Sequence, residues 1–369
     1  MKILLIRLRL VGDVVFTTPA VRAVRRRFPQ AHIAYLIEQS AAPVLHGNPH
    51  IDELIVVRHA RGLARILDDA SLAARLRRSR FDVVVDLHGG PRSSWLTWAS
   101  GAPRRIGYTI PGRTWMYTEQ ISRPRELRAR HSVENQWDLL RPLEIEPPDP
   151  ERDRVEMADD PEARQRAERK LAACGVGRQH EVIVMHVSAG NPFRRWPVES
   201  FAETAARLAS VDPGRRVVFT SGPSDATAAA DLAEMTRSRL GPVLEERIAR
   251  CDEFDLAELR GVIQRAALFI GGDSGPLHVA ATTDTPIVAL YGPTLPARSA
   301  PWRPARFVNE RVDAGALPCR PCDQRRCEPG DFRCLTLVTP DAVVRAAERA
   351  LAREREMTAA VMPSTRAAR

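Results

Sequence analysis

The sequence predicts an α/β protein made of two domains, each a parallel sheet flanked by helices. An apolar strand at the chain start, Lys2 to Leu8, runs through a glycine turn into residues with helical apolar spacing. A second strand–turn–helix unit begins at Phe269 and is followed by another apolar strand, Val288 to Tyr291. The length of 369 residues is more than one hydrophobic core usually serves, so we expect two cores.

The first domain is expected to cover residues 1–160 and to carry a carboxylate beside its first helix. Apolar spacing predicts a helix from Val14 to Phe28, with Gly12 and Asp13 in the turn before it. The oxygens of Asp13 would face the space above the sheet, although an aspartate after a glycine can also be a plain helix N-cap. Further strands are predicted at Ile33–Leu36, Glu53–Val57 and Val83–Leu87.

A cluster of prolines marks the end of this domain: Pro142, Pro147, Pro148 and Pro150. Their rigid, extended backbone suits a hinge between domains. A charged helix from Pro161 to Ala173 follows and leads into the second domain, expected at residues 175–340. Residues 341–369 are expected to form a C-terminal helix and a flexible tail.

The segment from Phe269 to His278 has the composition of a phosphate-binding turn. Its glycines allow a ligand to approach the backbone closely, and the helix predicted from Leu277 to Thr282 would present free amides at its start. The spacing matches neither the dinucleotide fingerprint GxGxxG nor the P-loop GxxxxGK[ST]. It therefore favours a nucleoside diphosphate bound without a P-loop lysine. The alternative is a tight turn whose glycines serve packing only.

A second anion-binding loop is predicted after the strand Val182–Val187. It carries Ser188 and two neighbouring cations, Arg194 and Arg195, and it ends at Pro197, which suits the start of a helix. We expect Arg194 to grip the diphosphate and Arg195 to contribute less. The alternative is a solvated basic loop without a ligand.

The balance of charge favours an anionic partner. The formal net charge is +9, and of 55 basic residues only Lys2 and Lys170 are lysines. Such a balance fits a phosphorylated glycolipid at a membrane surface, or nucleic acid.

Mean hydropathy is −0.27, no apolar run approaches the roughly 18 residues of a transmembrane helix, and Arg7 and Arg9 interrupt the first apolar stretch. We therefore expect a cytoplasmic chain without a signal peptide.

The six cysteines fall into two groups. Cys174 and Cys251 are expected to be ordinary core thiols. The other four form a C-x2-C-x4-C-x6-C cluster: Cys319, Cys322, Cys327 and Cys334. Four thiols at this spacing can hold a structural zinc ion, stay free or pair as disulfides, or hold an iron–sulfur cluster.

Motifs in the order and separation of a known enzyme family run from the chain start to about residue 350. They include RLRLVGDVVFTTPAVRAVRRRFP, DLHGGPRSS, HVSAGNPFRRWP and GGDSGPLHVAATTDTPIVALYGPT. This set resembles the ADP-heptose:lipopolysaccharide heptosyltransferases, glycosyltransferase family nine. The resemblance implies a GT-B fold, in which two Rossmann-like domains face each other across a cleft. It places the acceptor sugar on the amino-terminal domain and the nucleotide sugar on the carboxy-terminal domain.

The resemblance also implies roles for single residues in an inverting transfer. Asp13 would remove the proton of the acceptor hydroxyl. Arg194 stands where the family usually has a lysine, and Asp273 would bind hydroxyls of the donor sugar. The other residues expected to bind the nucleotide sugar are Ser188, Asp225, Ser274, Gly275 and His278. The residues expected to bind the acceptor are Gly12, His88 and Arg92.

The expected partners follow from this reading. They are an ADP-sugar donor and an anionic glycolipid acceptor. The enzyme is expected to be a monomer that acts in the cytoplasm, at the cytoplasmic face of the inner membrane, and to need no cofactor for transfer. One alternative is another GT-B enzyme, either a transferase for a different nucleotide sugar or a nucleotide-sugar epimerase. The other is a non-enzymatic basic protein that binds nucleic acid or anionic membrane. An aromatic content of 5% and the lack of a nucleic-acid motif argue against that alternative.

Overall fold

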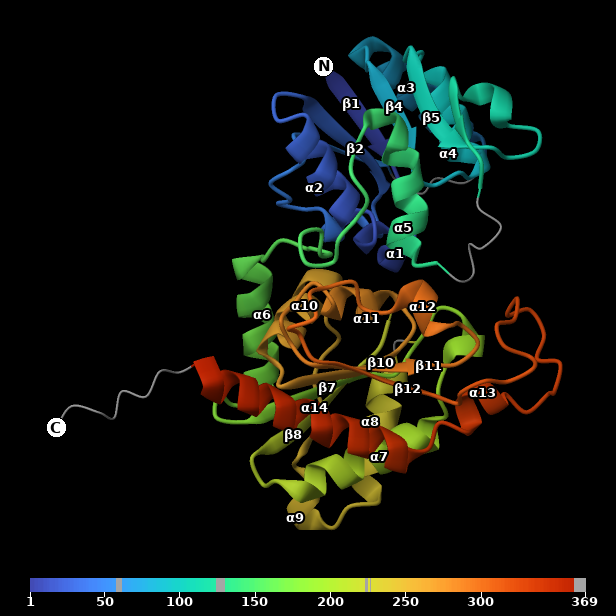
Figure 1. Ribbon diagram of the computed structural model, residues 1–369. Coiled ribbons are helices and arrows are strands. Elements are labelled where there is room, and N and C mark those ends of the chain that lie inside the picture. Colours follow the sequence, from blue (N-terminus) through green and yellow to red (C-terminus); the bar gives the residue numbers. More distant parts are fainter. Residues whose placement is uncertain (58–61, 124–129, 223–224, 226, 362–369) are drawn as a thin grey trace. The chain divides into compact units, whose positions relative to one another are not determined.

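The computed structural model describes residues 1–57, 62–123, 130–222, 225 and 227–361, and this part of the chain divides into two compact units (Figure 1). The first unit comprises Met1–Asp159 together with Trp302–Pro304. The second comprises Asp160–Pro301 and the chain from Ala305 onward. In each unit, helices flank a parallel sheet.

The first unit is built on six parallel strands in its described part, in the order β3-β2-β1-β4-β5-β6. These strands are β1 (Lys2–Ile6), β2 (His32–Glu38), β3 (Glu53–Val57), β4 (Val83–Asp86), β5 (Arg104–Tyr108) and β6 (Glu119–Ile121). The helices are α1 (Val11–Val15), α2 (Thr18–Arg27), α3 (Gly62–Ser79), α4 (Pro91–Ala99) and α5 (Ser132–Trp137), with short 3₁₀ turns at Ala42–Val44, Thr114–Met116 and Asp138–Leu143. The central strands are buried on both faces, which explains their nearly unbroken apolar sequence.

The single helix predicted from Val14 to Phe28 is wrong, because the structure divides it into α1 and α2. Pro19, in the first turn of α2, has no N–H with which to continue the helical ladder from α1. The hydroxyl of Thr17 donates to the Val14 carbonyl at 2.7 Å and satisfies that acceptor at the break.

The second unit repeats the same winding, with six parallel strands among its described residues in the order β12-β11-β10-β7-β8-β9. These strands are β7 (Glu181–His186), β8 (Arg215–Thr220), β9 (Ile248–Ala249), β10 (Leu268–Gly272), β11 (Ile287–Tyr291) and β12 (Asn309–Asp313). The helices are α6 (Pro161–Ala173), α7 (Val198–Val211), α8 (Ala228–Ser238), α9 (Pro242–Glu245), α10 (Leu256–Arg265), α11 (Gly275–Ala280), α12 (Pro296–Ser299), α13 (Arg333–Thr336) and α14 (Pro340–Val361), with a 3₁₀ turn at Pro192–Arg194.

The C-terminal helix α14 belongs to the core of the second unit. Its buried residues Val343, Ala346, Ala347 and Ala350 join the cluster formed by the sheet and α7. The helix runs past α7 in Figure 1. The flexible tail predicted beyond this helix lies outside the described residues from position 362 on. Across the described ranges, no helix has both the length and the apolar character that crossing a bilayer requires.

Each sheet has one topological switch point, where the direction of the strand order reverses, and ligands of doubly wound sheets bind beside such a point. In the first unit the switch point lies between β1 and β4, and in the second between β7 and β10. The loops at the carboxyl ends of these strands carry most of the predicted site residues.

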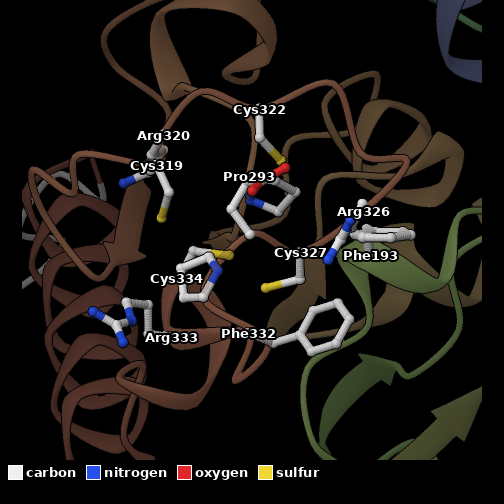
Figure 2. A pocket seen from close by; sticks show the side chains of 12 residues that line it. Phe193, Pro293, Cys319, Arg320, Cys322, Arg326, Cys327, Phe332, Arg333 and Cys334 are labelled. Atoms are coloured by element: carbon white, nitrogen blue, oxygen red, sulfur yellow. The ribbon is translucent and has the colours of Figure 1, made fainter.

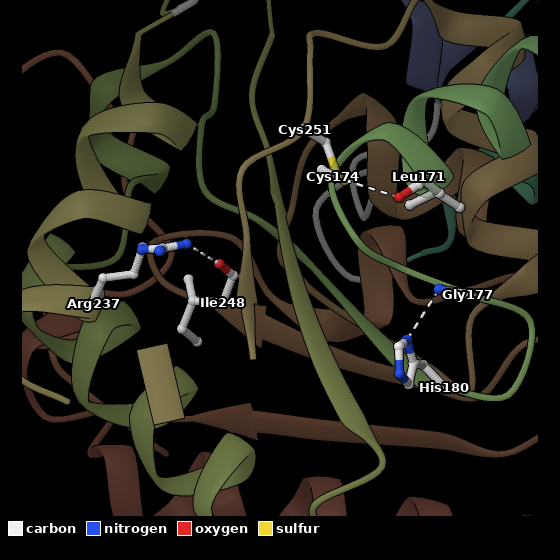
Figure 3. The surroundings of a disulfide bond; sticks show 7 residues. All are labelled: Leu171, Cys174, Gly177, His180, Arg237, Ile248 and Cys251. Carbon is white, nitrogen blue, oxygen red and sulfur yellow. Dashed lines mark hydrogen bonds between the residues drawn. A yellow bond between two sulfur atoms is a disulfide. The ribbon is translucent and has the colours of Figure 1, made fainter. Parts of the chain in front are cut away.

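Cys174 and Cys251 are not ordinary core thiols, so that prediction is wrong. The two residues are half-buried and form a disulfide (Figure 3). Cys174 is the C-cap that follows α6, and Cys251 lies between β9 and α10, the helix that packs against α6. This packing brings the two Cα atoms to 5.3 Å, a normal separation for a disulfide.

Candidate active site

The two loops of the second unit that are predicted to bind an anion meet at the carboxyl ends of β7 and β10. Gly272 ends β10, and a Cβ at this position would lie 3.2 Å from the backbone carbonyl oxygen of Arg194. The glycine therefore permits a close approach between the β10 turn and the loop after β7. Arg194 and Asp273 are brought together by this approach.

Arg194 contacts Asp273 through one guanidinium nitrogen. Nη1 donates to the Asp273 carbonyl oxygen at 3.1 Å and lies 3.2 Å from the carboxylate Oδ2. Nε of Arg194 donates to Oε1 of Gln324 at 2.7 Å. About a third of the Arg194 side chain, 32%, remains exposed, so the cation stays accessible to a ligand.

Asp273 is a buried carboxylate held in its ionised form. Burial by itself raises the pKa of this group, but the His278 imidazole and the Arg194 guanidinium outweigh that effect and lower the pKa to about 2. His278 Nε2 lies 3.6 Å from Asp273 Oδ1. In the described part of the structure, Oδ2 of Asp273 pairs with Arg194, and neither carboxylate oxygen has a partner in good hydrogen-bond geometry. Both oxygens retain acceptor capacity, and the side chain is only 3% exposed.

Helix α11 runs from Gly275 to Ala280, with Ser274 as its N-cap and Pro276 in its first turn, as predicted. The side chain of Ser274 does not cap the helix but donates to the Gly272 carbonyl at 3.3 Å. Both residues are half-buried, and amides in the first turn of a helix have no helical acceptor. Ser274 and Gly275 therefore present the start of α11 beside Asp273, and their role toward an anion stays a prediction.

Ser188 links the loops after β7 and β8. Its hydroxyl lies 3.2 Å from His186 Nε2 and accepts from the Gly222 amide at 2.7 Å. His186 Nδ1 lies 3.0 Å from the Thr220 hydroxyl, and burial lowers the pKa of His186 to about 4. The imidazole is therefore neutral at neutral pH, and Ser188 is engaged by protein groups in the structure.

Arg195 and Asp225 form the next pair along the same edge. Arg195 Nη1 lies 3.1 Å from Asp225 Oδ2, while Arg195 Nε donates to the Ala189 carbonyl at 2.9 Å. Asp225 is thus held beside the loop that carries Arg194. The two adjacent arginines differ in their partners, since Arg194 points to the β10 turn and Arg195 to the β8 turn.

Asp13 of the first unit lies in the first turn of α1 and pairs with Arg7, which follows β1. Arg7 Nη2 lies 2.5 Å from Asp13 Oδ2, and Arg7 Nη1 donates to the Leu87 carbonyl at 2.8 Å. The Asp13 side chain is 36% exposed, and its backbone carbonyl accepts from Gln136. Gly12, beside Asp13, is buried.

His88 follows β4 next to this pair. Burial, and then the positive charge of Arg7, lower the pKa of His88, which keeps the imidazole neutral at neutral pH. The loop is fixed by the fully buried Asp86, whose Oδ1 accepts from the backbone amides of His88 at 3.0 Å and Gly89 at 2.9 Å. Asp13 and His88 therefore share Arg7 as a neighbour.

Arg92 forms ion pairs with two carboxylates of the first unit. Its guanidinium donates to Asp69 at 2.6 Å and to Glu38 at 3.1 Å, and only 12% of the side chain is exposed. The structure thus places this predicted acceptor ligand in an ion-pair network within its own unit. Its role toward an acceptor stays a prediction.

The four remaining cysteines line one pocket of the second unit (Figure 2). Cys319, Cys322, Cys327 and Cys334 are free thiols, each half-buried. Burial, and then the three neighbouring sulfurs, raise the pKa of Cys334. In the described residues, no group of three or more cysteine, histidine or acidic side chains is arranged to hold a metal ion. The predicted zinc site therefore has no support in this arrangement.

Comparison with known proteins decides the family. The sequence model of glycosyltransferase family 9 (heptosyltransferase) matches residues 70–329, well over half of the chain. The chain belongs to glycosyltransferase family 9. It is similar to lipopolysaccharide heptosyltransferase 3 of Escherichia coli, with 28% identity over 321 residues that cover 86% of this chain and 91% of that protein.

Two solved structures resemble this family 9 glycosyltransferase over nearly its full length. A glycosyl transferase family 9 protein from Veillonella parvula has a TM-score of 0.78 and 26% identity, covering 95% of this chain and 97% of the other. The ADP-heptose lipopolysaccharide heptosyltransferase II of E. coli has a TM-score of 0.76 and 21% identity, covering 96% and 100%. The predicted family, the enzyme class and the fold class of two parallel sheets flanked by helices, as in GT-B enzymes, are confirmed.

Two contacts of this family 9 site were not predicted from the sequence. In the sequence Arg7 interrupts an apolar stretch, and a cation that directly follows a buried strand also indicates a partner at the sheet edge. Gln324 carries no local signal, because it lies among the cysteines and reaches Arg194 only in the folded chain.

Proposed function

We propose that this chain is an inverting glycosyltransferase that moves a heptose from ADP-heptose to an acceptor of the lipopolysaccharide-core type. The observation that carries the proposal is the buried, ionised Asp273 beside the accessible cation Arg194. The name of the similar E. coli heptosyltransferase II includes ADP-heptose, which supports adenine as the base of the donor and heptose as its sugar.

The donor site is proposed on the second unit. A diphosphate is attracted by Arg194 and by the first-turn amides at Ser274 and Gly275. A carboxylate beside a diphosphate repels it, so we assign Asp273 to another part of the ligand. The two oxygens of Asp273, which have no partner in good hydrogen-bond geometry in the described structure, suit the hydroxyls of the donor sugar. The further residues proposed to bind the nucleotide sugar are Ser188, Asp225 and His278.

The acceptor site is proposed on the first unit, with Asp13 as the general base. The acceptor oxygen attacks the anomeric carbon while its proton passes to a carboxylate oxygen of Asp13. The bond between the anomeric carbon and the diphosphate oxygen breaks, and ADP leaves with its charge stabilised by Arg194 and the α11 amides. Attack opposite to the leaving group inverts the anomeric configuration. Gly12, His88 and Arg92 are proposed to contact the acceptor.

The proposal includes an anionic glycolipid acceptor, which fits the net charge of +9, and a monomeric enzyme at the cytoplasmic face of the inner membrane. No cofactor takes part in the proposed transfer. A structural zinc ion is not part of the proposal, because no group of three or more cysteine, histidine or acidic side chains among the described residues is arranged to hold a metal ion.

The test is a transfer assay with purified protein. Truncated lipopolysaccharide lacking its outer heptose is incubated with ADP-heptose and, in parallel, with UDP-glucose and GDP-mannose, and product mass and nucleoside diphosphate release are measured. We expect transfer from ADP-heptose alone, with a product of inverted anomeric configuration. Transfer only from another nucleotide sugar would overturn the assigned donor, and binding of ADP-heptose without transfer to any truncated form would overturn the assigned acceptor class.

A further inference from the structure

We propose that Gln324 is a positioning residue for Arg194. It connects the cysteine-lined loop to the arginine that binds the diphosphate in the donor site. This inference rests on the proposed function of Arg194. Gln324 lies between Cys322 and Cys327, in the segment after β12 that lines the pocket of Figure 2. Nothing in its local sequence points to the donor site.

One side-chain amide joins three segments that are distant in sequence. Oε1 of Gln324 accepts from Nε of Arg194 at 2.7 Å and from Nδ2 of Asn191 at 3.0 Å. Its Nε2 donates to the hydroxyl of Thr294, which follows β11, at 3.4 Å. The same side chain therefore contacts the loop after β7 and the loop after β11. Gln324 also has a left-handed backbone, with φ of 61°, and such conformations are retained where the surroundings hold them.

Arg194 is held on two sides as a result. Gln324 engages Nε, while Asp273 engages Nη1 through its carbonyl and its carboxylate. A free arginine side chain loses considerable rotamer entropy when it grips a phosphate, and a guanidinium that is already oriented loses less. The contacts with Asp273 fix only the position of Nη1, so the plane of the guanidinium can still turn around that atom. The hydrogen bond from Nε to Gln324 fixes a second point and thereby sets the orientation of this plane.

The loop that carries Gln324 is itself anchored to the sheet. The side chain of Arg320, only 3% exposed, donates to Asp313 Oδ1 at 3.1 Å and to the Thr294 carbonyl at 2.9 Å. Asp313 ends β12, and Thr294 follows β11. The amide of Gln324 is thus presented to Arg194 from a fixed support, which a positioning role requires.

The experiment measures the affinity of ADP and of adenosine by calorimetry for the full chain and its variants. Gln324→Met keeps the length of the side chain and removes the acceptor, and it should raise the Kd of ADP by about three- to tenfold, the range for one lost hydrogen bond. The Kd of adenosine, which has no diphosphate, should not change. Gln324→Asn tolerates the left-handed backbone but cannot reach Arg194, and it should show the same ADP-specific loss. Gln165→Met, at an exposed position of α6, is the matched control and should equal wild type.

A double-mutant cycle separates positioning from general damage. In a chain that already carries Arg194→Ala, adding Gln324→Met should change the Kd of ADP less than twofold, because the residue it positions is gone. Additive losses, equal losses for ADP and adenosine, or wild-type affinity of both Gln324 variants would each overturn the inference while the proposed function stands. If the wild-type protein binds no ADP, both the proposed function and this inference are wrong.

Discussion

Arg7 Nη2 lies 2.5 Å from Asp13 Oδ2, while the same guanidinium donates to the Leu87 carbonyl through Nη1. The proposed base is therefore held by a cation that is itself fixed to the end of the neighbouring strand. The pair spans the topological switch point of the first sheet, between β1 and β4. A carboxylate oriented in this way loses little freedom when an acceptor hydroxyl binds beside it.

Asp13→Asn should lower kcat by about two to four orders of magnitude, because the amide cannot accept the proton of the acceptor hydroxyl. The affinity for ADP-heptose, proposed to bind on the other unit, should remain nearly unchanged. Steady-state kinetics and calorimetry measure the two quantities. The matched control is Asp159→Asn, close to the boundary of the units, which should retain normal turnover. Wild-type turnover of Asp13→Asn would remove Asp13 from the mechanism.

Arg194→Ala should weaken the binding of both ADP-heptose and ADP by about 1.5 to 3 kcal/mol, the range for a hydrogen bond to a charged group. Arg195→Ala should weaken binding less, because Arg195 is turned toward Asp225 and the Ala189 carbonyl. The dissociation constants of the two variants check the assignment. The reverse order of effects would move the diphosphate contact to Arg195, and equal, negligible effects would show that this loop binds no diphosphate.

Asp273→Asn should weaken ADP-heptose binding by about 1.5 to 3 kcal/mol, since it replaces a charged hydrogen-bond acceptor for sugar hydroxyls. ADP, which has no sugar beyond its diphosphate, should bind as well as before or more tightly. The ratio of the two dissociation constants is the measurement, and thermal unfolding confirms that the variant is folded. A larger loss for ADP than for ADP-heptose would contradict the sugar role.

The neutral, buried His186 should make stability depend on pH. Its pKa is about 4 in the folded protein and about 6.5 when unfolded, so the unfolded chain binds the proton first as the pH falls. The free energy of unfolding should therefore decrease between about pH 6.5 and pH 4, by at most about 1.4 kcal/mol per pH unit. Urea unfolding across this window should show a shallower dependence for His186→Gln. His46→Gln, at an exposed position, should follow the wild type.

The disulfide predicts a defined thiol count. Unfolded without reductant, the protein should present four reactive thiols, those of Cys319, Cys322, Cys327 and Cys334. After reduction the count should rise to six, when Cys174 and Cys251 are released. Cys251→Ser should lower the free energy of unfolding by about 2 to 4 kcal/mol, since the unfolded chain regains the freedom that the cross-link removes. Six thiols before reduction would show that the bond does not form in the isolated protein.

Several elements could be predicted because their determinants are local. The strand Glu53–Val57 and the helix Pro161–Ala173 have the bounds that were predicted. Asp160 caps that helix with its own carboxylate, and Pro161 suits its first position, so neighbouring residues decide where it begins. The split between α1 and α2 was missed, because apolar spacing continues across Pro19 although the hydrogen-bond ladder does not.

The sequence by itself determined the two-sheet α/β class, the family, the position of Asp13 at the start of the first helix, and that of Asp273 directly after a buried strand. Apolar runs, glycine turns and motif order are properties of neighbouring residues, so they can be read along the chain. Only the tertiary structure decided which partners these groups have: Arg7 for Asp13, Gln324 for Arg194, and Cys251 for Cys174. Arg194 and Gln324 are 130 positions apart. Contacts at such separation depend on the strand order, which places the loops after β7, β10 and β11 at one edge and which no local pattern encodes.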